Sequence, residues 1–212
     1  RDRAGTAVTA QNSVRVAQVH FLSPEMVAAQ IDAVLSDYGA AAIKTGFIGR
    51  VNLIEAIAER LRHWQPVLQP FILIDPVLVN HRGVAMFAPE VAAAYREHLF
   101  PLADLVTPNR HEAALLAGRE NWLGESSAEL FSVLGAQRAL VKGLPDGDGL
   151  ADALWDGIEL LRLPHERVAT SNLHGSGDTL SAAICAGVAQ GLPLPAAVRR
   201  AQVYTLAAIR LG

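Results

Sequence analysis

The sequence predicts an α/β fold in three layers, with a mostly parallel central sheet and helices on both of its faces. Two observations lead to this prediction. Short runs such as Phe71–Ile74 are apolar on both faces of a strand, as strands buried within a parallel sheet are. Segments with helical spacing of apolar residues lie between these runs, and strands that alternate with helices build parallel sheets. With 212 residues the chain can bury a core of its own, so we expect a single domain over 1–212.

The predicted strands are short apolar runs that end at a turn or at a polar residue. Phe71–Ile74 stops at Asp75-Pro76, and Ala40–Thr45 stops at Gly46. The dipeptide Asp156-Gly157 is typical of a tight hairpin turn. In chain order the predicted strands are Thr6–Ala10, Ala40–Thr45, Phe71–Ile74, Leu105–Val106 and Ala139–Val141, followed by the hairpin pair Ala153–Trp155 and Glu159–Leu163.

The predicted helices have apolar residues three and four positions apart. Ser23 can cap the first helix, with Pro24 in its first turn, and Gly118 can close a later one. In chain order the predicted helices are the segment that begins at Pro24, then Asn52–Trp64, Glu90–Leu99, Arg110–Leu116, Ser126–Leu134, Thr179–Gln190 and Pro195–Leu211.

Composition excludes several classes of function. The formal net charge is −3, so neither nucleic acid nor a membrane surface is expected as a partner, because both require a basic patch. Cys185 is the only cysteine, which excludes a disulfide framework and fits a reducing cytosol, so we expect a cytoplasmic protein. No apolar run is long enough to span a bilayer. The lysines are Lys44 and Lys142, and both stand at the ends of apolar runs.

Polar residues that follow the strands mark the expected site, since ligands of parallel sheets lie beyond the carboxyl ends of the strands. These residues are Gln11-Asn12, Lys44-Thr45, Asp75, Thr107–Asn109 and Lys142. The chain has no Gly-x-x-x-x-Gly-Lys-Ser/Thr and no Gly-x-Gly-x-x-Gly after its first strand. A P-loop nucleotidase and a dinucleotide enzyme are therefore not predicted.

The segment Gly175-Ser176-Gly177-Asp178 leads directly into a predicted helix. Glycines before a helix let backbone N–H groups point toward one place, where the helix N-terminus adds about half a positive charge. Such an anion hole suits the charge that builds on a transferring phosphoryl group. Asp178 can take the proton from an attacking hydroxyl. The alternative is that Asp178 only caps the helix and that the glycines only make a turn.

The order of these motifs along nearly the whole chain resembles the ribokinase-like superfamily, and within it the hydroxymethylpyrimidine/phosphomethylpyrimidine kinases of thiamine biosynthesis. The resembling segments are Thr9–Asn12, Lys44–Gly49, Asp75–Val79, Pro101–Asp104, Thr107–Asn109, Glu112-Ala113, Leu140–Gly143, Asn172, His174–Gly177 and Thr179–Ile184. The resemblance implies a ribokinase-like fold and phosphorylation of hydroxymethylpyrimidine and of its monophosphate. It also implies ATP and Mg²⁺ as cofactors and a homodimeric assembly.

The resemblance further implies roles for single residues. Asp178 would be the catalytic base, and Gly175, Ser176 and Gly177 would stabilise the moving phosphoryl group. The other residues are Gln11, Gly46, Phe47 and Val77 for the pyrimidine; Asn109, Lys142, His174 and Thr179 for ATP; and Asp75 and Glu112 for the metal ion, partly through water.

Structural roles compete with four of these assignments. Phe47 can be a core aromatic residue, Glu112 a solvated residue of a first helical turn, and Lys142 a surface lysine at a strand end. His174 can make a purely structural hydrogen bond.

Two departures from the family bear on the substrate. The family usually has cysteine where this chain has Asp178, whereas pyridoxal kinases, ribokinase and adenosine kinase have aspartate. The family's opening strand with its Gly-rich substrate loop, and its C-terminal tail, have no counterpart, so we expect the chain to lack them. Pyridoxine or pyridoxal kinase activity is the first alternative function. A catalytically silent pyrimidine-binding regulatory domain is the second.

Overall fold

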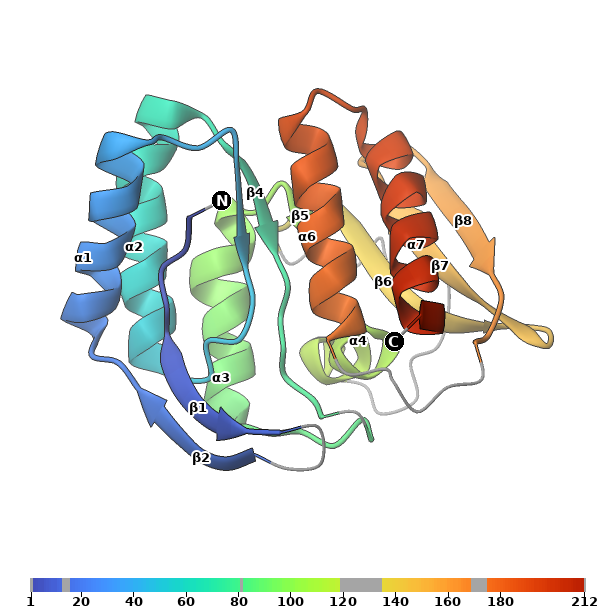
Figure 1. Ribbon diagram of the computed structural model, residues 1–212, viewed down its shortest axis with the longest axis horizontal. Coiled ribbons are helices and arrows are strands. Elements are labelled where there is room, and N and C mark those ends of the chain that lie inside the picture. The colour runs from blue at the N-terminus through green and yellow to red at the C-terminus, as the bar shows by residue number, and fades with distance from the viewer. Residues whose placement is uncertain (1, 13–15, 81, 119–134, 169–174, 212) are drawn as a thin grey trace.

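A six-stranded sheet in the order β3-β4-β5-β6-β7-β8 forms the centre of the molecule (Figure 1). The structure is a computed structural model that describes residues 2–12, 16–80, 82–118, 135–168 and 175–211. Strands β3 to β6 pair in parallel, and β6, β7 and β8 pair antiparallel, so the mostly parallel sheet is confirmed. The strands are β3 (Ala42–Thr45), β4 (Phe71–Ile74), β5 (Leu105–Val106), β6 (Ala139–Asp146), β7 (Gly149–Trp155) and β8 (Leu160–His165).

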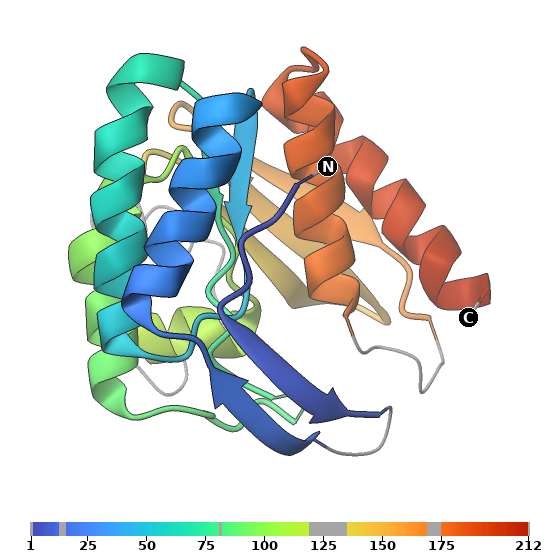
Figure 2. The ribbon, with the colours of Figure 1, turned by 60° about the vertical axis from the view of Figure 1, so that its left-hand side comes forward.

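Helices cover both faces of this sheet, as Figures 1 and 2 show from two directions. Helices α6 and α7 lie on one face, and α2, α3 and α4 on the other, with α1 packed against α2. The helices are α1 (Pro24–Asp37), α2 (Val51–Leu68), α3 (Pro89–Ala94), α4 (Arg110–Ala117), α6 (Ser176–Ala189) and α7 (Leu194–Leu211). The predicted helix over Ser126–Leu134 lies outside the described residues.

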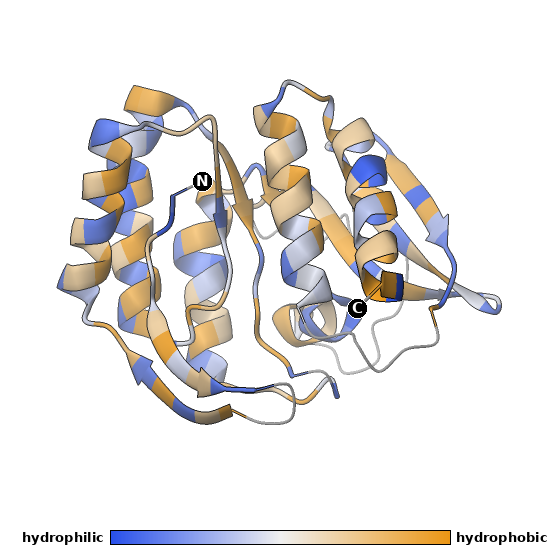
Figure 3. Ribbon diagram, viewed as in Figure 1, coloured by the Kyte–Doolittle hydropathy of each residue, from blue (hydrophilic) through white to orange (hydrophobic). Residues whose placement is uncertain are grey.

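Alternate residues of each central strand enter different cores. In β4, Ile72 and Ile74 pack toward α2 and α3, whereas Leu73 packs toward α6 and α7. All three are fully buried, which is why the strand is a continuous apolar run rather than an alternating one. Figure 3 shows the same arrangement, with apolar central strands and helices whose colours alternate.

The helix boundaries follow local capping chemistry. The Ser23 hydroxyl accepts a hydrogen bond from the Met26 N–H at 3.2 Å, which confirms the predicted start of α1. Gly118 closes α4 in the left-handed conformation, with φ of 65°. The predicted helix over Glu90–Leu99 is α-helical only to Ala94. A π-helical turn, Tyr95–Leu99, and a 3₁₀ turn, Phe100–Leu102, continue it.

One predicted strand belongs to a different sheet. β1 (Ala7–Gln11) pairs antiparallel with β2 (Val16–Phe21) in a separate two-stranded sheet, which we call the flap (Figure 2). The expectation that the Thr6–Ala10 strand joins the parallel sheet was therefore wrong, and β2 was not predicted. Both strands are mostly exposed and so lack the apolar runs of the central strands. Within the described part of the chain, no helix is long and apolar enough to cross a membrane.

Candidate active site

The Asp75 carboxylate lies at the centre of a polar cluster at the end of β4. It is buried, and three donors reach it: Lys142 Nζ at 3.0 Å, Thr107 Oγ1 at 3.0 Å and Ser181 Oγ at 2.9 Å. Thr107 follows β5, Lys142 is in β6, and Ser181 is in α6. Because parallel strands end at one edge of the sheet, residues far apart in the sequence meet there.

Both lysines of the chain converge on this cluster. Lys44, in β3, has its Nζ 3.9 Å from Asp75 Oδ2 and 2.9 Å from Asp178 Oδ1. Burial alone would lower the pKa of Lys142, but the neighbouring Asp75 and Glu112 carboxylates raise it above its usual value. The Lys142 ammonium is therefore charged near neutral pH. The side chains of both lysines flank the start of α6.

Helix α6 begins at the predicted glycine-rich segment. Gly175 is its N-cap residue in the left-handed conformation, with φ of 76°, which a side chain would disfavour. The Thr179 hydroxyl and N–H both donate to the Gly175 carbonyl, each at 2.9 Å. A Cβ atom at Gly177 would stand 3.3 Å from Lys142 Nζ, so the lysine ammonium lies directly beside the first turn. The helix N-terminus and this cation together favour an anion here.

Asp178 lies in that first turn and is accessible, with 58% of its side chain exposed. Gly46, in the loop after β3, faces it closely: a Cβ atom there would lie 3.3 Å from Asp178 Oδ1 and 3.6 Å from Lys44 Nζ. The segment after β3 thus leaves room for Asp178 and Lys44 to meet. An exposed carboxylate beside an anion site can take a proton from an attacking hydroxyl group.

Glu112 and Asn109 form a reciprocal cap at the start of α4. The Asn109 side chain accepts hydrogen bonds from the N–H groups of His111 and Glu112 at 2.9 and 3.0 Å. Glu112 Oε2 accepts the Asn109 N–H at 2.8 Å. Glu112 Oε1 accepts the Leu78 N–H at 3.1 Å. Glu112 is buried rather than solvated, and burial raises its pKa to about 7.

Asp75 and Glu112 do not fit a site that binds Mg²⁺ directly through their carboxylates. Protein donors already occupy both carboxylates, and Asp75 is paired with an ammonium group. Among the described residues, no group of three or more His, Cys, Asp and Glu side chains is arranged to hold a metal ion. Oxygen atoms of phosphates and water are the ligands that Mg²⁺ prefers in such sites.

The residues predicted to line a pyrimidine pocket lie in two regions, the loops after β3 and β4 and the flap. Phe47 is half-buried in an aromatic cluster with Phe21 of the flap, at a centroid distance of 5.9 Å, and with Phe87 at 5.6 Å. The Thr6 hydroxyl donates to the Phe47 carbonyl at 2.7 Å, which also ties the flap to this loop. Val77 lies in the loop after β4. Gln11 lies at the exposed end of β1, on the flap, and not at the edge of the central sheet as expected.

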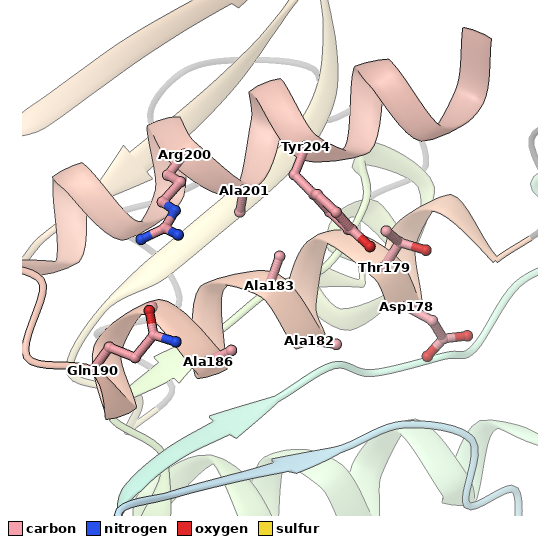
Figure 4. A pocket seen from close by; sticks show the side chains of 10 residues that line it. Asp178, Thr179, Ala182, Ala183, Ala186, Gln190, Arg200, Ala201 and Tyr204 are labelled. Carbon is pink, nitrogen blue, oxygen red and sulfur yellow. The ribbon is translucent and has the colours of Figure 1, made fainter. Parts of the chain in front are cut away.

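A groove of about 460 Å³ runs between α6 and α7, and Asp178 lies at one end of it. Figure 4 shows Asp178 and Thr179 at this end and Gln190 and Arg200 at the other, with alanines between them. Its Asp178 end belongs to the site at the start of α6. His174 lies outside the described residues.

Three residues of the cluster were given no individual role from the sequence. Lys44 and Thr107 stood among the polar residues that follow strands, which was the available signal. Ser181 gave no such signal, because it is an interior residue of an apolar helix. Its hydroxyl contributes only because α6 packs across the end of β4.

Comparison with known proteins agrees with this geometry. Residues 3–212 match the phosphomethylpyrimidine kinase family. Hydroxymethylpyrimidine/phosphomethylpyrimidine kinase from Rhizobium meliloti is 45% identical over 209 residues, which are 96% of this chain and 77% of the relative.

Two solved structures have the same fold. The phosphomethylpyrimidine kinase from Clostridium difficile is 28% identical, with a TM-score of 0.84 over 97% of this chain and 85% of that chain. Pyridoxal kinase from Staphylococcus aureus in complex with ADP is 29% identical, with a TM-score of 0.86 over 97% and 76%. The ribokinase-like fold and the resemblance noted in the sequence are both confirmed, and the chain belongs to the phosphomethylpyrimidine kinase family.

Proposed function

We propose that this chain transfers the terminal phosphoryl group of ATP to the hydroxymethyl group of 4-amino-5-hydroxymethyl-2-methylpyrimidine. A second transfer to the monophosphate then gives the diphosphate used in thiamine biosynthesis. The observation that carries the proposal is the placement of an exposed carboxylate, Asp178, in the first turn of a helix flanked by Lys44 and Lys142. Family membership supports the substrate, and the kinase relatives support ATP.

In the first transfer the substrate hydroxyl oxygen attacks the γ-phosphorus as its proton passes to Asp178. The bond from the γ-phosphorus to the β–γ bridging oxygen breaks, and ADP leaves. Backbone N–H groups of Gly175, Ser176 and Gly177 stabilise the negative charge on the moving group. Lys142, held against Asp75, contributes a positive charge beside the same turn.

In the second transfer the acceptor is a phosphate monoester. The second pKa of such a monoester is about 6, so the monoester is already a dianion near pH 8 and has no proton for a base to remove. Asp178 therefore matters chiefly for the first transfer. Lys44 pairs with Asp178 in this structure and is close enough to Asp75 to exchange partners when an anionic acceptor binds.

The remaining predicted site residues bind the two substrates in this proposal. Asn109 and Thr179, together with His174, contribute to ATP binding, and Gln11, Gly46, Phe47 and Val77 bind the pyrimidine. Asp75 and Glu112 would contact the water ligands of a Mg²⁺ ion bound to ATP, and the ion would neutralise charge on the phosphates. We further propose that the protein is a cytoplasmic homodimer, as the resemblance implies.

Pyridoxal kinase activity is the second candidate, favoured by two observations. Asp178 stands where the pyrimidine kinases usually have cysteine, and the structure is similar to that of a pyridoxal kinase. Purified protein offered each substrate with Mg-ATP decides between them. We expect kcat/KM for hydroxymethylpyrimidine to exceed that for pyridoxal and pyridoxine by at least about tenfold, or 1.4 kcal/mol. The reverse order contradicts the pyrimidine assignment.

The same assay tests the third possibility, a catalytically silent regulatory domain. Such a domain binds the pyrimidine in calorimetry but releases no ADP from ATP. We expect ADP release that depends on the pyrimidine. Tight pyrimidine binding without ADP release, by protein whose folding has been verified, contradicts the kinase proposal.

A further inference from the structure

A row of alternating charges crosses the sheet on the face that α6 and α7 cover. From β3 to β8 its members are Lys44, Asp75, Lys142, Asp152 and His165. They share this face with the strand leucines that pack against α6 and α7, because side chains two residues apart in a strand point the same way. The first three members lie in the site described above. Asp152 and His165 have no part in it.

Asp152 is a buried carboxylate in the middle of β7 and contacts three other elements. Its Oδ1 accepts the backbone N–H of Gly143 in β6 at 2.9 Å and lies 3.4 Å from His165 Nε2 in β8. Its Oδ2 accepts the Gln202 side-chain amide of α7 at 2.8 Å. A buried carboxylate is costly unless donors satisfy it, so these contacts hold its position tightly.

The contact with Gly143 lies at a β-bulge next to Lys142. The pairing of β6 and β7 shifts between Val141 and Leu144, so that Lys142 and Gly143 together stand opposite Asp152 alone. Gly143 has φ of 72°, in the left-handed region. The bulge bends β6 at Lys142, whose side chain extends from the strand to Asp75. The side chain of Asp152 satisfies the Gly143 N–H within that irregular pairing.

We propose that Asp152 is a positioning residue for Lys142: it holds the bulge that directs the lysine to Asp75 and to the start of α6. The inference rests on the proposed function, because the position of Lys142 matters for catalysis only if this ammonium contacts the phosphates of ATP. Asp152 itself touches no reacting atom.

His165 and Gln202 hold Asp152 in turn. The His165 ring has Asp152 Oδ1 on one nitrogen and the Glu166 carbonyl oxygen, at 3.1 Å, on the other. Both partners are acceptors, so the doubly protonated ring satisfies both. Its hydrogen bond to Asp152 raises the pKa of His165. The Glu166 carboxylate is paired with Arg210 of α7, and its negative charge also contributes to the raised pKa of His165.

Three single variants test the proposal in the full protein. Asp152→Ala removes the acceptor for Gly143, whereas Asp152→Asn keeps an oxygen there. Asp146→Asn is the matched control, since Asp146 lies in the same hairpin and pairs with Arg162 in an exposed ion pair. We expect Asp152→Ala to raise the Kd for ATP by about tenfold, with the Kd for the pyrimidine within twofold. Asp152→Asn and Asp146→Asn should stay within threefold of wild type for both ligands.

A double-mutant cycle asks whether Asp152 acts through Lys142. Lys142→Met should weaken ATP binding, and adding Asp152→Ala should weaken it no further, because the side chain being positioned is gone. If Asp152→Ala does not fold, Gly143→Ala takes its place in the cycle. A Cβ atom there meets nothing within 4 Å, so this change acts on the backbone of the bulge alone. We expect it to raise the Kd for ATP at least threefold.

The NMR signals of the two lysine side chains test the inference without ATP. In protein with ¹³C-labelled lysine, the Lys44→Arg and Lys142→Met variants assign the two signals, and Asp152→Ala should shift the Lys142 signal only. An unshifted signal, or ATP affinity equal to that of Asp146→Asn, overturns the positioning role. If wild type does not bind ATP, or Lys142→Met binds it normally, the proposed function fails instead.

Discussion

Lys44 and Asp178 form an ion pair, with Nζ 2.9 Å from Oδ1. The two residues are 134 positions apart in the sequence, Lys44 in β3 and Asp178 in α6. The pair fixes the orientation of the Asp178 carboxylate, which a proton acceptor requires. It also holds a cation next to the position where an attacking oxygen would stand.

Replacing Lys44 with methionine tests that pair. We expect kcat for the hydroxymethyl acceptor to fall by about tenfold, or 1.4 kcal/mol, because Asp178 loses the cation that orients it. The melting temperature should change little, since Asp178 is exposed and the buried Asp75 keeps its pairing with Lys142. Steady-state kinetics and a thermal melt measure both. Lys44→Arg, which keeps the charge, is the control, and a kcat within twofold of wild type for Lys44→Met argues against an orienting role.

Asp75→Asn tests the buried centre of the site. The change leaves the Lys142 ammonium without its carboxylate in a buried position, which costs about 3–5 kcal/mol of unfolding free energy. Urea denaturation measures this loss. Asp146→Asn makes the same chemical change in an exposed pair and should cost less than about 1 kcal/mol. Equal losses for the two variants would show that burial of the Asp75 pair has no special effect.

Glu112 predicts a pH dependence of stability. Burial raises its folded-state pKa to about 7, above the value of 4.5 for an unperturbed glutamate. Between these values the folded protein binds more protons than the unfolded chain, so the free energy of unfolding falls as pH rises from about 4.5 to 7. The loss is of the order of 3 kcal/mol from this group.

Chemical denaturation at several pH values, with Glu112→Gln alongside, measures that contribution. His165 also has a raised pKa, and its contribution is likewise lost as pH rises. Only the difference between wild type and Glu112→Gln isolates Glu112. We expect the unfolding free energy of wild type to fall relative to that of Glu112→Gln as pH rises across this range. A difference that stays constant contradicts the raised pKa.

Phe47→Ala tests the connection between the flap and the site. The substitution removes the contacts of this ring with Phe21 and Phe87, and we expect it to cost about 2 kcal/mol of stability. KM for the pyrimidine should rise at least about tenfold, or 1.4 kcal/mol, while KM for ATP stays within threefold. Kinetics with each substrate varied in turn measures the two effects. Equal rises in both KM values would assign Phe47 to the core rather than to the pyrimidine pocket.

The sequence predicted the central strands best where both of their faces are buried. The bounds of β4 and β5 agree with the predicted runs, because every residue faces a core and the run stops at a polar residue. The flap was predicted only in part. The sequence predicted β1 as a strand but placed it in the central sheet, and it did not predict β2, whose residues are mostly exposed and form no apolar run.

The site was predicted as far as strand ends could reveal it. Asp75, Lys44 and Lys142 were all found as polar residues at strand ends, and they do meet. What the sequence could not reveal is which contacts they make. Asp152 is hidden in the middle of an apolar strand, and the bulge opposite it depends on the pairing of β6 with β7. That pairing is a tertiary property, and no residue spacing predicts it.

Asp178 is the proposed base for phosphoryl transfer to the pyrimidine hydroxyl. The single-turnover rate of product formation with saturating Mg-ATP, compared between wild type and Asp178→Asn, tests this role. The rate of the first transfer should fall by between about 100-fold and 10,000-fold. The affinity for ATP should stay within threefold of wild type, and the rate of the second transfer should fall much less than that of the first. A first transfer close to the wild-type rate contradicts the role of Asp178, whatever the substrate.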